Sequence, residues 1–531
     1  MAHCASANAA STNTASTNSV STNTSSTIAA STNAETTAIR RIVIAGGGTA
    51  GWMAAAALSK TLGKILDITL IESDEISTVG VGEATIPTLV TFHRLLDINE
   101  QQFMAATQAT FKLGISFENW RDVDQDYIHS FGTTGKDHWT AGFQHFWLKG
   151  RARDLAGDYG DYCLELKAAQ QNRFAHLPRI GINYAFHMDA GFYAKFLRNF
   201  SEGFGARRIE GKIAEVLTDP ASNRITALRL DSGDLIEGDL FIDCTGFRGL
   251  LIGQTLGVEY EDWSQWLHCD SAIAVQTESV GEPVPYTRSI AHTAGWQWRI
   301  PLQHRVGNGI VFSSRFLDDA QATQSLLQNI HGATLTQPRT IRFQPGQRQQ
   351  TWSGNCVALG LASGFLEPIE STSIHLIQRG IVRLLQMFPA NGISPSDIDE
   401  YNRQTRAEIE HIRDFIILHY HVTSRQDTPF WKTCREMEIP ASLRHRIELF
   451  RDTGRVFRVP NELFAENSWI QVMLGQGLLP QQYHPVADLM GDAELSQFLN
   501  GIRSGIEGTV AQLPSHEAYI RSYCAAPRPV T

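Results

Sequence analysis

A glycine-rich turn near the start of the chain constrains the fold more than any other feature. Arg41 to Ala45 is a short run of β-branched residues that ends abruptly at a glycine. Gly46, Gly48 and Gly51 follow in Gly-x-Gly-x-x-Gly spacing, and the alanine-rich run from Met53 to Lys60 predicts a helix. Strand, turn and helix in this order are typical of a dinucleotide-binding unit, because a Cβ at these glycines would block the tight turn and the approach to a pyrophosphate.

Neighbouring residues complete the expected dinucleotide site. The N-terminus of the helix, which includes Thr49 and Ala50, presents unpaired N–H groups to the phosphates. A second predicted strand, Asp67 to Ile71, ends at Glu72. Glu72 lies roughly 20 residues beyond the last glycine, where a carboxylate usually holds a ribose hydroxyl.

Two later segments favour FAD over NAD as the dinucleotide. Asp239 to Gly246 and Asn355 to Gly360 are each an apolar run that ends in glycine, and they resemble the return strands of FAD-binding monooxygenases. We therefore include Gly360 in the flavin site. The chain has no second Gly-x-Gly-x-x-Gly motif for NAD(P)H, so we expect a separate NAD(P)H-dependent flavin reductase to supply reduced flavin.

Composition limits the class of partner and the compartment. With 42% hydrophobic and 19% charged residues, the chain has the composition of a soluble globular protein. A net charge of −10 argues against a nucleic-acid partner, and the longest apolar run, Ile42 to Leu58, contains four glycines and does not predict a membrane span. The seven cysteines show neither a Cys-x-x-Cys pair nor zinc spacing, which predicts reduced thiols in a cytoplasmic enzyme without a metal site.

The first segment of the chain differs in composition from the rest. Met1 to Thr37 consists mainly of Ala, Ser, Thr and Asn in imperfect repeats and lacks the apolar core of a signal peptide. Because such a segment has little apolar surface to bury, we predict a disordered tail over residues 1–38.

A second motif is much rarer than the glycine-rich turn. Gly295 to Pro301 reads Gly-Trp-Gln-Trp-Arg-Ile-Pro, and together with the glycine-rich turn it makes the chain resemble the flavin-dependent tryptophan halogenases. The resemblance extends from about Arg41 to about Gly491. Its further blocks, in the order of the family, are Gly80–Pro87, Phe111-Lys112, Phe117–Trp120, Phe365–Thr372, Thr423–Arg425 and Asp427–Trp431.

The resemblance and the alternating pattern of strands and helices imply an α/β fold with a Rossmann-like, FAD-binding core of the monooxygenase type. We expect this domain, with interleaved substrate-pocket segments, over residues 39–393. A mostly helical region that caps the substrate should cover residues 394–531, with an amphipathic helical stretch at His411 to His419. The oligomeric state stays open, with a homodimer as one candidate.

The resemblance also implies an activity. Enzymes of this kind use reduced FAD (FADH2) and O2 to oxidise chloride or bromide to hypohalous acid, which travels through a tunnel to an electron-rich aromatic substrate. We therefore predict halogenation of indole, a substituted indole or a tryptophan-like molecule. Two alternatives are a flavin-dependent aromatic hydroxylase on the same fold and a non-catalytic flavin-binding protein.

Lys112 and Glu370 match the catalytic lysine and glutamate of the family. The Lys112 ammonium can hydrogen-bond hypohalous acid and polarise it, or the free amine can be converted to a haloamine; the sequence leaves both routes open. A carboxylate at Glu370 can stabilise a cationic ring intermediate, accept the ring proton or orient the electrophile. Glu367 is the nearby alternative carboxylate.

The halide and the tunnel are assigned to other matched positions. The resemblance places the halide at the backbone amides of Thr372 and Ser373, where the tryptophan enzymes have Gly in place of Ser373, so the preference for chloride or bromide stays open. Trp296 and Trp298 should line the passage between flavin and substrate and act sterically, by keeping the organic substrate away from the flavin.

Three positions are assigned to the aromatic substrate. His129 and Phe131 match two residues that contact the indole in tryptophan halogenases. The stretch from Val459 to Trp469 lacks the family's Tyr pair and has Phe464 where a stacking Trp is expected. We therefore predict a more open pocket that accepts indole or simple indoles and holds free tryptophan weakly.

Overall fold

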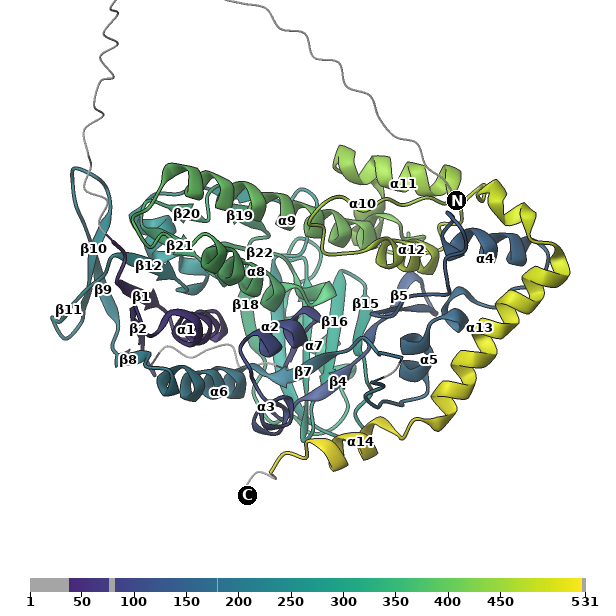
Figure 1. Cartoon of the computed structure of the whole chain (residues 1–531), viewed down its shortest axis with the longest axis horizontal. Coiled ribbons are helices and arrows are strands. Elements are labelled where there is room, and N and C mark those ends of the chain that lie inside the picture. The colour runs from purple at the N-terminus through teal and green to yellow at the C-terminus, as the bar shows by residue number, and fades with distance from the viewer. Residues whose placement is uncertain (1–37, 76–81, 179, 528–531) are drawn as a thin grey trace, which may run out of the picture. The chain divides into compact units, whose positions relative to one another are not determined.

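The computed structural model describes residues 38–75, 82–178 and 180–527 (Figure 1). All of them belong to one compact unit. The predicted disordered tail lies outside the described residues except for Ala38, and so does the start of the Gly80–Pro87 block.

A mixed six-stranded sheet forms the core of the predicted dinucleotide-binding unit. Its strand order is β20-β21-β12-β1-β2-β8, and all neighbours pair in parallel except β20 with β21. The strands are β1 (Arg41–Ala45), β2 (Asp67–Glu72), β8 (Arg207–Glu210), β12 (Leu240–Asp243), β20 (Trp352–Ser353) and β21 (Cys356–Ala358). The two predicted return strands are thus β12, which pairs with β1, and β21, which pairs with β12. Their apolar runs are those expected of buried strands in a parallel sheet.

One helix packs against this sheet and against two further helices. Helix α1 (Thr49–Leu62) follows the glycine-rich turn and packs against α6 (Ala190–Gly203) and α8 (Ser373–Gln386). Its residues Met53 to Leu58 are buried, which the small alanine side chains permit because neighbouring elements can approach closely. The prediction of an α/β fold is confirmed.

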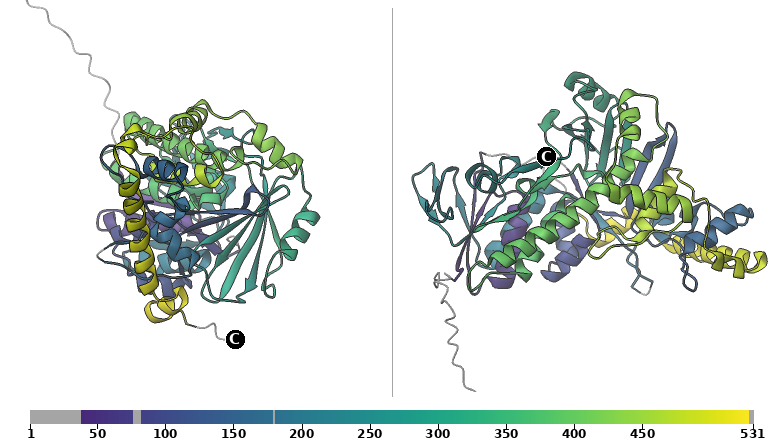
Figure 2. Two further views of the ribbon diagram at one scale, coloured as in Figure 1. Left: turned by 90° about the vertical axis from the view of Figure 1, so that its right-hand side faces the viewer. Right: turned by 90° about the horizontal axis from the view of Figure 1, so that it is seen from above.

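A second sheet carries the Trp-x-Trp motif, and Figure 1 shows its strands to the right of the six-stranded sheet. Figure 2 gives two further views of the same arrangement. Its order is β18-β14-β17-β16-β15-β5-β6. The strands are β5 (Gly114–Asp122), β6 (Gln125–Ser130), β14 (Ser271–Glu278), β15 (Thr287–His292), β16 (Gly295–Pro301), β17 (Arg305–Phe312) and β18 (Arg339–Arg342).

Three small sheets complete the strands. The sheet β3-β7-β4 joins β3 (Gly82–Ala84), β7 (Ala185–Asp189) and β4 (Thr110–Lys112), so it carries the predicted catalytic lysine. The other two contain β9 (Ile213–Thr218), β10 (Ile225–Leu230) and β11 (Leu235–Glu237), and β13 (Tyr260–Asp262), β19 (Gly346–Arg348) and β22 (Gly364–Phe365). The remaining helices before residue 394 are α2 (Thr88–Leu95), α3 (Glu100–Thr107), α4 (Phe143–Ala152), α5 (Leu164–Gln170) and α7 (Asp319–Gln328).

The region after residue 394 is helical, as predicted. It contains α9 (Pro395–His421), α10 (Pro429–Glu436), α11 (Ala441–Thr453), α12 (Glu466–Gly475), α13 (Asp492–Gln512) and α14 (His516–Tyr523). The predicted helical stretch at His411 to His419 lies in α9, but the expectation that it is amphipathic is wrong. Every residue from Ile412 to Tyr420 is buried, because the second sheet, α10, α11 and α12 surround the last turns of this helix. Among the described residues, no helix is both long and apolar enough to cross a membrane.

The close packing of α1 against the glycine-rich turn can be tested at the third glycine of the motif. Gly51 lies in α1, and a Cβ there would meet the carbonyl oxygen of Gly46 at 1.9 Å. Gly505 lies on an exposed face of α13 with no atom within 4 Å of its Cβ position. Because alanine favours helix over glycine by about 1 kcal/mol, we expect G505A to raise the free energy of unfolding and G51A to lower it. Urea unfolding measures both, and an equal gain at the two positions would contradict the close approach of α1 to the turn.

Candidate functional site

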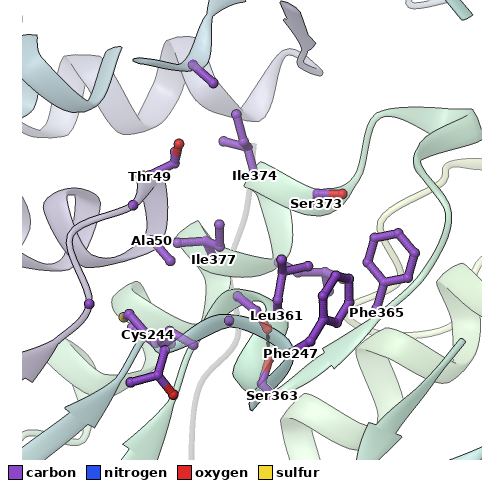
Figure 3. Close-up of a pocket in the computed structure, with 18 of the residues that line it drawn as sticks. Thr49, Ala50, Cys244, Phe247, Leu361, Ser363, Phe365, Ser373, Ile374 and Ile377 are labelled. Atoms are coloured by element: carbon purple, nitrogen blue, oxygen red, sulfur yellow. Dashed lines mark hydrogen bonds between the residues drawn. The ribbon is translucent and has the colours of Figure 1, made fainter. Parts of the chain in front are cut away.

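A cavity of about 790 Å³ opens beside the glycine-rich turn (Figure 3). The turn, the ends of β2 and β12, and the start of α8 all contribute to its wall. Of the seven residues predicted to bind the cofactor, six line it: Gly46, Gly48, Thr49, Ala50, Glu72 and Gly360. The seventh, Gly51, is buried against the carbonyl of Gly46, which is the packing role of the third glycine in such units.

The shape of this wall depends on glycines, which have no side chain to fill the cavity. Gly46 has φ +106°, and a Cβ there would lie 2.3 Å from the carbonyl oxygen of Cys244. A Cβ on Gly47 would lie 1.6 Å from Oε2 of Glu72. Gly360 also has a positive φ, +62°, and faces Ala50. The result is a concave surface of backbone beside a helix N-terminus, which fits the pyrophosphate of a dinucleotide.

Glu72 is the last residue of β2, and its carboxylate accepts hydrogen bonds from two side chains. Arg208 donates to Oε1 at 2.5 Å, and Trp52 donates its indole N–H to Oε2 at 3.3 Å. These partners fix the side chain in the cavity wall. Oε2 can accept a further hydrogen bond from a ribose hydroxyl.

Some cavity residues were not predicted from the sequence. Cys244, Phe247 and Phe365 line the cavity, and the rings of Phe247 and Phe365 meet edge to face at 5.4 Å between centroids (Figure 3). Cys244 had a sequence signal because it directly follows the apolar run of β12, and Phe365 had one because it begins the matched block Phe365–Thr372. Phe247 lies in the short 3-10 helix Gly246–Arg248, where no periodic pattern identifies it.

Lys112 is fully buried at the end of β4, with no exposed surface. Its Nζ donates to the carbonyl oxygen of Thr85 at 3.0 Å and lies 2.7 Å from Oγ of Ser371, and it also lies 5.2 Å from the centroid of the Phe131 ring. Ser371 itself lines the cavity beside the glycine-rich turn, which is named the flavin cavity after the cofactor that the sequence predicts. Lys112 is therefore separated from that cavity by a single hydrogen-bonded side chain.

Burial changes the chemistry of this amine. Desolvation lowers the pKa of Lys112 from 10.5 to about 7, and the negative charge of Glu370 opposes that shift. Both the ammonium and the free amine are therefore accessible near neutral pH.

Glu370 lies between two histidines in the turn that precedes α8. Nδ1 of His129 lies 3.0 Å from both carboxylate oxygens, and Nε2 of His419 lies 2.8 Å from Oε1. Burial alone would raise the pKa of Glu370, but the charge and hydrogen bonds of the two histidines lower it to about 2. Glu370 is thus a buried carboxylate.

His419 is a site residue that the sequence reasoning missed. Its Nδ1 lies 2.8 Å from the carbonyl oxygen of Phe415, which only accepts, so Nδ1 carries a proton. Nε2 then carries one only in the imidazolium form. The position of His419 on the predicted helical stretch was the only sequence signal.

The predicted substrate residues are linked to the same carboxylate through His129 and Lys112. His129 lies 6.3 Å from Phe464 between ring centroids, and Phe464 stacks on Phe415 at 3.8 Å. Nε2 of His129 is buried and has no hydrogen-bond partner among the described residues. Lys112, Phe131, Glu370, His129 and Phe464 therefore lie in one linked cluster, and none of these five is in the wall of the flavin cavity.

The two tryptophans of the Trp-x-Trp motif line the flavin cavity from β16. Their rings meet at 6.2 Å in an edge-to-face arrangement. Trp296 donates its indole N–H to Oε2 of Glu367 at 2.8 Å, whereas the N–H of Trp298 has no partner among the described residues. Both rings are buried, as expected of a wall.

The predicted halide residues lie at the N-terminus of α8. Ser371 has φ +59°, Thr372 precedes the helix and Ser373 is its first residue. Ser373 lines the flavin cavity, and Oγ1 of the buried Thr372 has no partner among the described residues. A helix N-terminus with unpaired N–H groups is a favourable environment for an anion.

Comparisons with known proteins agree with this geometry. A family model described as tryptophan halogenase matches residues 41–492. The chain belongs to this family. Tryptophan 7-halogenase RebH of Lentzea aerocolonigenes is 34% identical over 524 residues, which cover 91% of this chain and 98% of that protein.

Solved structures of flavin-dependent halogenases are also similar to this chain. Xcc4156 from Xanthomonas campestris is 71% identical with a TM-score of 0.92, covering 93% of this chain and 100% of the other. BrvH from Brevundimonas sp. BAL3 is 45% identical with a TM-score of 0.88, covering 92% and 99%. The predicted fold and the prediction of a flavin-dependent halogenase are confirmed, and the hydroxylase alternative is not favoured.

The two carboxyl groups of the turn before α8 differ in the direction of their pKa shift. The dependence of stability on pH tests this difference at Glu367. Burial raises the pKa of Glu367 from 4.5 to about 7, against the hydrogen bonds from Trp296 and Tyr420. Its contribution to the free energy of unfolding is therefore full below about pH 4.5 and is lost as the pH rises through 7. We expect the destabilisation caused by E367Q to be larger at about pH 5 than at about pH 8. Urea unfolding at both pH values measures it, and a larger loss at the higher pH would contradict the assignment.

Proposed function

We propose that this enzyme uses FADH2, O2 and chloride or bromide to halogenate indole or a simple substituted indole. The observation that carries the proposal is the buried Lys112, which lies one side chain behind the flavin cavity and beside the cluster of Glu370, His129 and Phe131. A buried cation costs free energy unless the site uses it.

The glycine-lined cavity would hold FAD, with Gly46, Gly48, Thr49 and Ala50 at the pyrophosphate and Glu72 at the ribose. When bound in its reduced form, the flavin supplies with O2 the oxidising power that converts a halide ion into hypohalous acid. The backbone amides of Thr372 and Ser373 would hold the halide at the N-terminus of α8.

Lys112 would then bind the oxidised halogen on the side away from the flavin. As an ammonium it donates a hydrogen bond to hypohalous acid and polarises it; as an amine it forms a haloamine and releases water. The pKa of about 7 for Lys112 is compatible with either route. In both, Lys112 delivers the electrophile within the substrate cluster.

Glu370 would stabilise the cationic ring that forms when the halogen adds. A carboxylate with a pKa of about 2 is a weak base, so we assign it first an electrostatic role. It also lies within hydrogen-bond distance of His129 and His419, which gives the proton leaving the ring a path away from the substrate.

Trp296 and Trp298 would separate the two reactions. Their buried rings form part of the cavity wall, so the organic substrate stays in the cluster and the flavin reacts only with O2 and halide. Their role is steric.

The aromatic substrate would contact His129, Phe131 and Phe464. Similar proteins have names that specify tryptophan as the substrate, for example RebH. In this chain one face of Phe464 is covered by Phe415, and the stretch around it lacks the Tyr pair of the tryptophan enzymes. We therefore propose that indole and simple indoles fit better than the amino acid.

A separate NAD(P)H-dependent flavin reductase would supply FADH2, and we place the reaction in the cytoplasm, where reduced nicotinamide is available. We also propose that residues 39–393 act as the FAD-binding part and residues 394–531 as the cap, with a homodimer as one candidate assembly.

Replacement of Lys112 tests the catalytic assignment. We expect K112A to bind FAD as the parent protein does, because Lys112 does not line the flavin cavity, and to lose halogenation completely. FAD titration and mass spectrometry of products from indole with bromide measure the two properties. Halogenation that persists in K112A would overturn the proposed function.

Substrate choice tests the open pocket. We expect kcat/KM for indole to exceed that for L-tryptophan, because the stretch from Val459 to Trp469 lacks the Tyr pair of the tryptophan enzymes and should hold a zwitterion weakly. Mass spectrometry with chloride and with bromide, using chemically reduced FAD, measures both rates. Fast, tight turnover of tryptophan would refute the pocket assignment without affecting the role of Lys112.

A further inference from the structure

Glu367 is a buried carboxyl group that the reaction described above does not use. Only 1% of its surface is exposed, and it does not line the flavin cavity. Its Oε2 accepts two hydrogen bonds, from the indole N–H of Trp296 at 2.8 Å and from the hydroxyl of Tyr420 at 2.7 Å. Its Oε1 has no partner among the described residues.

This arrangement joins three elements that are far apart in the sequence. Trp296 comes from β16, Glu367 from the turn before α8, and Tyr420 from the last buried turn of α9. The preceding residue in α9, His419, contacts Glu370 at the other end of the same turn. Two adjacent residues of one helix thus hold the two carboxyl groups of one turn.

A buried carboxyl group that is only partly satisfied is costly to the fold. An apolar side chain of similar size would pack at this position without that cost. The presence of Glu367 is explained if its oxygen is needed to hold the Trp296 ring, since a large indole has more than one rotamer available.

We propose that Glu367 is a positioning residue that fixes the indole of Trp296 in the wall of the flavin cavity and thereby keeps the organic substrate away from the flavin. The inference rests on the proposed function and adds a third residue, after Trp296 and Trp298, to those that separate the two reactions. Tyr420 supports Glu367 from the opposite side.

The two competing reactions have different products. Halogenation converts a ring C–H bond, a halide ion, a proton, O2 and FADH2 into a C–X bond, FAD and two molecules of water. If the substrate reaches the flavin, a ring C–H bond, O2 and FADH2 give a C–OH bond, FAD and one molecule of water. The ratio of hydroxylated to halogenated indole therefore reports how well the wall excludes the substrate.

The experiment compares E367L with E367Q in the full-length protein, with indole, bromide and reduced FAD. Gln keeps an oxygen that accepts from Trp296 and Tyr420, so we expect E367Q to retain the product ratio of the parent protein. Leu removes the acceptor, and we expect the ratio of hydroxylated to halogenated product to rise about tenfold, the effect of losing one buried hydrogen bond. An unchanged ratio in E367L would overturn the inference.

A second variant addresses the case in which E367L does not fold. W296F keeps a ring in the wall but removes the N–H donor, so we expect the same change in product ratio. In the double variant E367L/W296F the effects should not add, because both remove one interaction. Additive effects would show that Glu367 does not act through Trp296.

Y193F is the matched control. Tyr193 is also fully buried, and its hydroxyl bonds to His93 at 2.8 Å away from the cavity wall. We expect Y193F to lose stability and keep the product ratio, whereas Y420F should change both. If the parent protein does not halogenate indole or any other aromatic, the proposed function fails, and if it halogenates but E367L leaves the ratio unchanged, only this inference fails.

Discussion

The buried ammonium group of Lys112 is the constraint on which the rest of the site depends. A lysine without exposed surface needs acceptors, and this one has Thr85 and Ser371, with the charge of Glu370 close enough to favour the protonated form. Thr85 follows β3, and Ser371 belongs to the turn before α8, so the lysine ties the small sheet to the flavin cavity. Lys112 is therefore one fixed point between the flavin cavity and the proposed substrate cluster.

The turn from Glu367 to Ser371 organises both sides of that point. Glu370 faces the histidines and is charged, whereas Glu367 faces Trp296 and Tyr420 and has its pKa raised by burial. When their surroundings shift the pKa values of two neighbouring carboxyl groups in opposite directions, the two groups are suited to different roles. Because α9 contacts both groups through adjacent residues, a shift of this helix would affect the wall of the cavity and the substrate cluster together.

Much of the fold was predictable because its signals are local. The β-branched run, the glycine spacing and the alanine-rich helix lie within about 20 residues, and the two return strands repeat the same apolar pattern. The matched blocks located Lys112, Glu370 and the tryptophans. The partners that tune these groups were not predictable, because Ser371, Tyr420 and Phe415 approach them only through tertiary packing. His419 lies on a stretch that appeared amphipathic by period, and its burial comes from elements contributed by other parts of the chain.

The central proposal is that the halide is oxidised in the flavin cavity and that the halogen is transferred to the aromatic ring in the cluster of Glu370, His129 and Phe131, with Lys112 between the two places. A crystal structure of the protein with FAD and indole bound together tests this most directly. The account predicts FAD in the glycine-lined cavity, indole against His129 and Phe131, and the Lys112 amine between them, with no contact between the two rings. An indole that stacks on the flavin, or that binds with Lys112 turned away from it, would contradict the account.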